Sequence, residues 1–294
     1  MLFFWSLVVD GVLAGAIYAL IALGFVVVYK ASGAINFALG EWALLGSRMT
    51  ATGVHAMGLG PTAAVASASV GMVAVALAFN RLVLRPMVGR PLLSVIMVTL
   101  GFGALIRGLT PLAFGAMPAA IPFPAPPAPL EMWGVPVAAE RLASAVIAVL
   151  CIALVGGLFR FTRTGLALRA IADDRQIAMA MGIDVHRHVS LAWAMLGAIS
   201  VVTGALWTIT SGGAFGVVIV GLKVFPILII GGLDSIPGVL VGAALVGVLE
   251  SLAAGYLDPL VGGGFSSIAS YLVLIAVLFA RPYGLFGRPQ VERV

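Results

Sequence analysis

An amide and a carboxylate follow the first long apolar stretch of this chain and stand at the start of the next one. They are Asn36 and Glu41, within the run Ile35-Asn36-Phe37-Ala38-Leu39-Gly40-Glu41. Polar groups inside a membrane are energetically costly, so they mark substrate or ion pathways by default. We expect Asn36 and Glu41 to line or gate a path across a bilayer, with Gly40 allowing a bend between two halves of a helix.

Four further charged residues lie within apolar stretches: Arg48, Arg107, Lys223 and Glu250. Glu41 and Arg48 are nearly two helical turns apart, so they share a face but are separated by about 10 Å along the axis. A direct ion pair between them in an unbroken helix is therefore excluded. Glu41 either faces a pathway or has a structural partner. Arg48 either faces a water-filled path or, like Arg107, extends towards the outer interface. The sequence leaves the roles of Arg48, Arg107, Lys223 and Glu250 open.

The composition places the chain in a membrane. Of its 294 residues, 62% are hydrophobic and only 9% are charged, with a mean hydropathy of +1.18. A soluble domain carries about 25% charged residues. The basic pI of 9.9 does not indicate nucleic-acid binding, because the arginines lie between long apolar runs. They are better interpreted as signals of membrane topology.

The apolar runs predict an all-α polytopic fold with eight or nine transmembrane helices. About 20 apolar residues span a bilayer as a helix, and continuous runs exclude the alternating pattern of a barrel. Lys223 and Pro226 interrupt one segment, 214–233, which either spans fully or is re-entrant. The pair Gly212-Gly213 is the expected break before it. The candidate spans are 5–29, 33–57, 61–79, 92–114, 142–159, 189–210, 214–233, 236–256 and 265–280.

Arginine is distributed unevenly among the connecting loops. It is concentrated in loops 80–91 and 160–188 and in the tail (Arg281, Arg288, Arg293), whereas loop 115–140 has no basic residue before its end. Loops rich in Lys and Arg stay in the cytoplasm. With nine spans, the N-terminus is then outside and the C-terminus is cytoplasmic. The first apolar segment lacks a basic region ahead of it, so we expect a retained anchor rather than a cleaved signal peptide.

The cytoplasmic loop 160–188 carries its own helical pattern. Thr164 can cap a helix that continues to Met181, and Gly182 can end it with a positive φ. Such a helix either inserts into a groove on another protein or lies on the membrane surface, and periodicity alone does not separate the two. The residues that recur at helical spacing are Leu168, Ile171, Ala172, Arg175, Ala178 and Met179.

Signatures of catalysis and metal binding are missing from the sequence. There is no phosphate-binding Gly-x-x-x-x-Gly-Lys-Ser/Thr loop, no His-Glu-x-x-His and no paired-cysteine spacing. His55, His186 and His188 lie in loops or at segment ends, and the last two would not share a helix face. Cys151 lies in an apolar run and is expected to be a packed thiol. We therefore expect no catalytic residue, metal or cofactor.

Three sequence blocks together resemble the LivH-type permeases of bacterial branched-chain amino-acid ABC importers. The resemblance covers nearly the whole chain in order. The blocks are Gly15-Ala16-Ile17-Tyr18-Ala19-Leu20-Ile21-Ala22-Leu23-Gly24 with Tyr29 and the run from Ile35 to Glu41; Gln176-Ile177-Ala178-x-x-x-Gly182; and Gly221-x-Lys223 with Gly231-Gly232-Leu233-Asp234-Ser235-Ile236-Pro237-Gly238.

This resemblance implies a permease subunit in the bacterial inner membrane, with residues 1–294 forming one transmembrane domain. It implies two cytoplasmic ATPase subunits that hydrolyse the ATP, a related second permease and a periplasmic substrate-binding protein. Segment 160–188 would couple the permease to the ATPases. The coupling residues would be Arg169, Asp174, Arg175, Ala178 and Gly182.

Two departures from the family pattern leave the substrate open. Leu39 stands where the family often has His, and Asp234 stands where it often has Gly. A urea or amide permease of the same family therefore remains an alternative to a branched-chain amino-acid permease. A secondary transporter driven by an ion gradient is a further rival, although no internal repeat is evident. The last rival function is an intramembrane enzyme or a non-transporting scaffold, and the sequence shows no catalytic set of residues.

Overall fold

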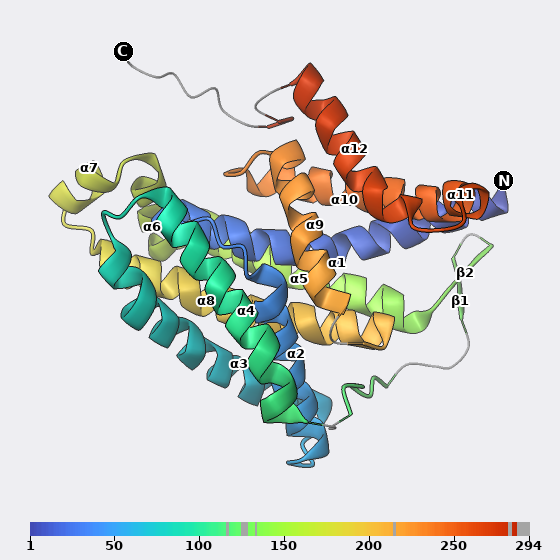
Figure 1. Cartoon of the computed structure of the whole chain (residues 1–294), viewed down its shortest axis with the longest axis horizontal. Coiled ribbons are helices and arrows are strands. Elements are labelled where there is room, and N and C mark those ends of the chain that lie inside the picture. Colours follow the sequence, from blue (N-terminus) through green and yellow to red (C-terminus); the bar gives the residue numbers. More distant parts are fainter. Residues whose placement is uncertain (116–117, 125–128, 133, 214–215, 282–283, 287–294) are drawn as a thin grey trace. The chain divides into compact units, whose positions relative to one another are not determined.

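The computed structural model describes the chain except for residues 116–117, 125–128, 133, 214–215, 282–283 and 287–294 (Figure 1). Arg288 and Arg293 of the tail, which is predicted to be cytoplasmic, lie outside the described residues. The elements in chain order are α1 (Leu2–Ser32), α2 (Leu39–His55), α3 (Pro61–Phe79), the π-helical turn η1 (Asn80–Leu84), the 3-10 turn η2 (Arg85–Met87), α4 (Leu92–Phe114), β1 (Leu130–Met132), β2 (Val135–Val137), α5 (Ala139–Phe161), α6 (Arg163–Asp173), α7 (Arg175–Ala180), α8 (Val185–Ser211), α9 (Gly216–Gly231), α10 (Ile236–Leu252), the π-helical turn η3 (Ala253–Leu257), α11 (Asp258–Val261) and α12 (Phe265–Ala280).

The chain is an all-helical, multi-pass membrane protein apart from one short antiparallel hairpin, β1–β2, among the described residues. In the same part of the chain, six helical stretches are long and apolar enough to cross a membrane. These are α1, α3 continued to Met87, α4, α5, α8 and α10 continued to Val261. Helices α9 and α12 are apolar but shorter. Each of the nine predicted segments contains one main helix.

The chain forms two compact units, which are described separately. The first contains residues 1–23, 125–149 and 223–294, and the second contains residues 24–124 and 150–222. In the second unit α2 packs against α3, α4 and α8, and α3 also packs against α8. Four aromatic rings lie in contact at the centre of this unit, from Trp42, Phe79, Phe102 and Trp193.

Small residues allow these helices to approach closely. In the second unit, a Cβ added at Gly46 would lie 2.8 Å from the Cα of Val201, and one added at Gly204 would collide with the carbonyl of Ala43. Backbones can meet at such distances only where no side chain intervenes. The α2–α8 contact therefore depends on glycine on both helices.

In the first unit, small residues of α1 lie against α10. Gly11 and Gly15 face α10, where a Cβ at Gly247 would collide with the Gly11 carbonyl and lie 2.9 Å from the Cα of Gly15. Helix α12 packs against α10 and η3 in the same unit. The small-residue positions of α1 thus set its distance from α10.

Two helix ends follow directly from local sequence. Helix α8 ends at Ser211 because Gly212 adopts φ +69°, a left-handed conformation that glycine enters without a steric penalty. This confirms the break expected at Gly212-Gly213. Helix α10 begins after Ser235, whose hydroxyl oxygen accepts a hydrogen bond from the N–H of Gly238 at 3.1 Å.

Two expectations about helix boundaries are wrong. Segment 33–57 is not one helix, because residues 33–38 are non-helical and α2 begins at Leu39. The helix expected from Thr164 to Met181 is two helices, α6 and α7, which are separated at Asp174. The cap of α6 is Thr162 rather than Thr164, since the Thr162 hydroxyl accepts from the N–H of Gly165.

Replacing Gly247 by Ala tests the close approach of α1 and α10. The added methyl group would overpack the contact and destabilise the chain by about 1–3 kcal/mol. We expect a lower yield and a lower melting temperature in detergent. Gly157→Ala is the matched control in α5, because a Cβ there meets nothing within 4 Å. Equal stability of the two variants would contradict the proposed role of Gly247.

Candidate functional site

Residues 33–38 form a non-helical stretch that packs along α4. The N–H of Phe37 donates to the Thr99 hydroxyl at 3.2 Å, and that hydroxyl lies 3.4 Å from the carbonyl of Ile35. Thr99 is 7 residues after Leu92, the first residue of α4, so it lies about 10 Å along the helix axis. The chain therefore leaves helical geometry beside the second turn of α4, where a side-chain hydroxyl of that helix bonds its backbone.

Asn36 is fully buried within this stretch. Its Oδ1 accepts a hydrogen bond from the N–H of Ala38 at 3.0 Å and so supports the start of α2. Its Nδ2 has no hydrogen-bond partner among the described residues. A buried donor without a partner is energetically costly. Asn36 thus keeps a donor group available at the first turn of α2.

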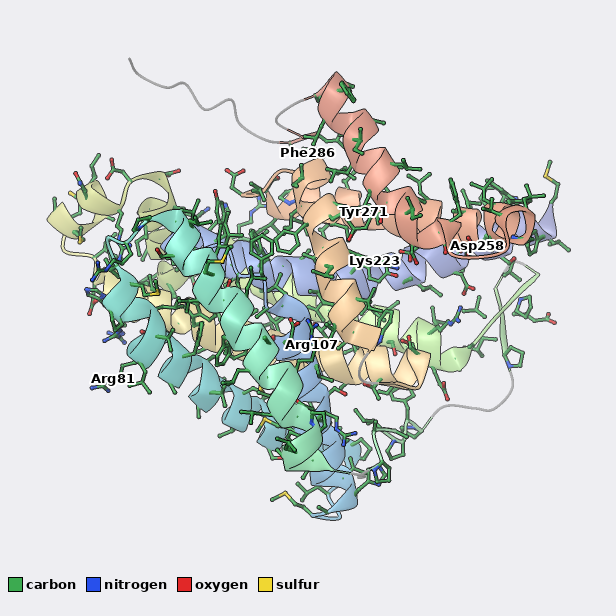
Figure 2. All side chains as sticks on the ribbon, viewed as in Figure 1. Arg81, Arg107, Lys223, Asp258, Tyr271 and Phe286 are labelled. Carbon is green, nitrogen blue, oxygen red and sulfur yellow. The ribbon has the colours of Figure 1, made fainter. Side chains whose placement is uncertain are left out.

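Glu41, in the first turn of α2, forms an ion pair with Arg107 of α4 (Figure 2). The Glu41 side chain is only 7% exposed, whereas that of Arg107 is 55% exposed. Gly103, one turn before Arg107, makes room for this contact, since a Cβ there would lie 3.3 Å from the Glu41 carboxyl carbon. Sequence spacing gave Arg107 no partner, whereas the structure pairs it with Glu41 and leaves more than half of its side chain exposed.

Gly40 does not bend a helix. It lies in the first turn of an unbroken α2, where added Cβ atoms at Gly40 and at Gly221 would each collide with the backbone of the opposite helix. Gly40 therefore brings α9 against the start of α2. The interruption of the helix that we expected at Gly40 lies earlier, in the non-helical residues 33–38.

Arg48 is placed further along α2 and does not pair with Glu41, as the sequence spacing requires. It donates to the carbonyl of Phe114 at 3.4 Å, and its guanidinium lies 5.7 Å from the centre of the Phe114 ring. Phe114 is the last residue of α4. Arg48 thus links the second half of α2 to the end of α4.

The first unit contains a second buried charge pair, which sequence spacing does not reveal. Lys223 of α9 and Glu250 of α10 form an ion pair, with side chains 11% and 15% exposed, and the Tyr18 hydroxyl donates to Glu250 at 3.2 Å. One observation points to it: each residue is an isolated charge of opposite sign in an otherwise apolar helix. Lone charges in a membrane require partners.

Segment 160–188 folds as α6, α7 and the start of α8. Asp174 breaks the helix and caps α7, because its Oδ1 accepts from the N–H groups of Gln176 and Ile177 at 2.7 and 2.9 Å. Asp184 caps α8 in the same way, and the N–H of Arg187 lowers the pKa of its carboxyl. Gly182 adopts φ +80°, as the sequence predicts for a helix end.

The surface of this segment differs from the periodic face that the sequence predicts. Ala178 is buried against Ile171 and Val185, and Leu168 is also buried, so these residues hold the segment together. Arg169 is exposed and Arg175 partly exposed. Of the apolar side chains on the predicted face, Met179 is exposed. Leu166, Ile177 and Met181 are exposed as well, with Met181 at 78%.

The two arginine-rich loops of the second unit meet at the same end of the helices. The Ser190 hydroxyl accepts from Asn80 and Arg85, both at 3.0 Å, which joins the 80–91 loop to the start of α8. At the opposite end of α2, the ring of His55 donates to the carbonyl of Ala120 at 2.7 Å. These hydrogen bonds between the 80–91 loop and the start of α8 agree with placing both arginine-rich loops on one side of the membrane.

Asn36 lies on the non-helical residues 33–38, which α4 holds through Thr99, and Glu41 follows in the first turn of α2. The segment 160–188 presents exposed apolar side chains. Among the described residues, no group of three or more His, Cys, Asp or Glu side chains is arranged to hold a metal ion.

Known proteins match this chain over its length. A family model described as "Branched-chain amino acid transport system / permease component" matches residues 7–280. The high-affinity branched-chain amino acid transport system permease protein LivH of Escherichia coli (strain K12) is 29% identical over 311 residues, covering 100% of this chain and 98% of that protein. The corresponding protein BraD of Pseudomonas aeruginosa is 29% identical over 307 residues, covering 97% and 96%.

A solved structure shows a similar fold. PsaBC from Streptococcus pneumoniae in complex with Fab matches with a TM-score of 0.51 and 12% identity, covering 94% of this chain and 92% of that one. At this identity the likeness supports the fold alone. The family match is the stronger finding, since it extends through both compact units. The chain therefore belongs to the family of branched-chain amino acid transport system permease components.

Proposed function

We propose that this chain is the membrane permease subunit of an ATP-driven ABC importer for branched-chain or related amino acids. The observation that carries the proposal is the family match over residues 7–280, together with relatives named as branched-chain amino acid permeases. Residues 1–294 act as a single transmembrane domain in the bacterial inner membrane. The substrate branch is open: urea and amides are the alternative to branched-chain amino acids.

The crossing from Gly33 to Glu41 is the proposed substrate path. Irregular backbone at membrane depth is tolerated where it is buried in protein or lines a cavity, and transporters place substrate sites at broken helices. Arg107 supports this assignment because a half-exposed guanidinium cannot face lipid without a large cost. Its exposed side faces the path or a second permease subunit.

The segment 160–188 is the proposed docking site for the ATPases. Its exposed Ile177, Met179 and Met181 suit an apolar groove, and Arg169 and Arg175 carry the charges beside them. This chain hydrolyses nothing itself: two cytoplasmic ATPase subunits supply the energy. A related second permease and a periplasmic binding protein complete the importer.

The proposed orientation places the N-terminus outside and the C-terminus in the cytoplasm. In a Cys151→Ala background, a cysteine at Met181 or Arg81 should resist an impermeant thiol reagent that is added to intact cells. A cysteine at Met57, in the loop between α2 and α3, should react, because that loop is outside. All three positions are exposed. Labelling at Met181 but not at Met57 would reverse the orientation.

Reconstitution tests the importer itself. The full chain is incorporated into proteoliposomes with the second permease, the ATPases and the binding protein, and uptake of radiolabelled leucine, urea and acetamide is measured. We expect uptake that requires ATP. Uptake driven by an ion gradient without the ATPases would contradict the proposal and favour a secondary transporter.

The variant Gly182→Leu tests coupling in the same system. Gly58→Leu is its control, because both glycines have positive φ (+80° and +63°) and open space at the Cβ position. Each substitution strains the backbone by about 1–2 kcal/mol. The two variants therefore differ only in which loop carries the strain. We expect Gly182→Leu to lose ATPase co-purification and uptake, and Gly58→Leu to retain both. Wild-type behaviour of Gly182→Leu would show that this segment is not the coupling element.

A further inference from the structure

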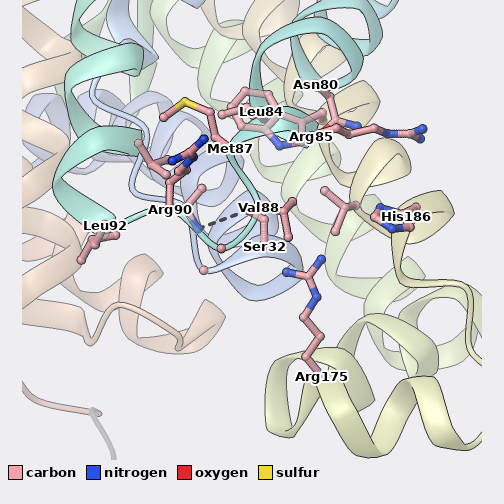
Figure 3. Close-up of a pocket in the computed structure, with 16 residues that line it drawn as sticks. Ser32, Asn80, Leu84, Arg85, Met87, Val88, Arg90, Leu92, Arg175 and His186 are labelled. Atoms are coloured by element: carbon pink, nitrogen blue, oxygen red, sulfur yellow. Dashed lines mark hydrogen bonds between the residues drawn. The ribbon is translucent and has the colours of Figure 1, made fainter.

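A basic pocket of about 250 Å³ lies in the second unit, at the end where the arginine-rich loops meet (Figure 3). It is formed by the end of α1, the turns η1 and η2, the start of α4, α7 and the start of α8. Its basic lining residues are Arg85, Arg90, Arg175 and His186. No Asp or Glu is among the described residues that line it.

The positive charges of this pocket are not neutralised within the described chain. None of the ion pairs formed there involves Arg85, Arg90 or Arg175. Arg85 donates only to the Ser190 hydroxyl, and Arg175 extends from α7 into the pocket. Asp174 and Asp184 accept backbone N–H groups as helix caps, and among the described residues neither forms an ion pair with these arginines.

We infer that this pocket binds a phosphate group, that of an anionic phospholipid headgroup at the cytoplasmic face of the membrane. Arginine forks match phosphate oxygens in paired hydrogen bonds, and several convergent arginines favour a group with more than one anionic oxygen. Basic pockets between helices on the cytoplasmic side are typical sites for anionic lipid headgroups.

The size and rim of the pocket agree with a headgroup. Pockets for drug-sized ligands occupy roughly 300–1,000 Å³, so this one suits a smaller group. Its lining includes the apolar residues Leu92 and Val88, which are about half exposed, beside Leu93 on the same turn of α4. These side chains offer acyl chains a surface directly beside the phosphate position. A free phosphate would make no use of that surface.

The ligand would connect α7 to the rest of the second unit through Arg175. Phosphate binding itself does not depend on the proposed import function, because it requires only the arginines and the cavity. Failure of transport and failure of lipid binding are therefore separate outcomes.

Native mass spectrometry of the full chain in detergent tests the assignment. The chain is titrated with dioleoylphosphatidylglycerol and with dioleoylphosphatidylcholine, and inorganic phosphate is added as a competitor. We expect tighter binding of phosphatidylglycerol, and a loss of roughly tenfold to thirtyfold in the Arg90→Gln/Arg175→Gln variant. The variant Arg90→Lys/Arg175→Lys should lose less binding than the Gln variant, because it keeps both charges but not the paired guanidinium hydrogen bonds.

The matched control is Arg81→Gln/Arg163→Gln, which removes two exposed arginines on neighbouring elements outside the pocket. It should bind phosphatidylglycerol within about twofold of the wild type. An equal loss in both double variants would show general surface attraction and overturn the pocket, as would unchanged binding in Arg90→Gln/Arg175→Gln. Displacement of the lipid by millimolar phosphate would assign the pocket to a soluble phosphate compound instead.

Discussion

The membrane interior offers no water to polar groups, so each charge buried in this chain must be met by another group of the protein. The Glu41–Arg107 ion pair meets that requirement for the start of α2. It fixes the first turn of α2 against the middle of α4, and the non-helical residues 33–38 then have to follow α4 as well. Thr99 supplies the side-chain oxygen that this backbone needs.

The two ion pairs within the apolar helices differ in how far they are enclosed. Lys223 and Glu250 are both largely enclosed and are joined by Tyr18, which is typical of a pair that holds helices together. Arg107, by contrast, keeps more than half of its side chain exposed while its partner is buried. A half-exposed guanidinium is suited to contact a polar solute, and Asn36 Nδ2 is a second donor without a partner among the described residues.

Local patterns in the sequence predict local structure well here. The apolar runs locate the main helices, Gly212 marks the end of α8, and Gly182 takes the expected positive φ, because each depends on neighbouring residues only. The partner of Glu41 lies 66 positions away, and spacing carries no information about it. The break at Asp174 was visible in principle, since aspartate is a frequent helix cap. The predicted outward face of segment 160–188 was wrong at Ala178, because Ala178 packs against Ile171 and Val185.

The central claim is that the Glu41–Arg107 pair lies on the substrate path. Removing one member of a buried pair destabilises a protein, while neutralising both removes that penalty. The decisive measurement is leucine uptake per assembled complex for Glu41→Gln/Arg107→Gln, compared with Lys223→Gln/Glu250→Gln as the structural control. We predict wild-type amounts of complex for both, with uptake reduced about tenfold or more only in the first. Normal uptake per complex in Glu41→Gln/Arg107→Gln would contradict the account.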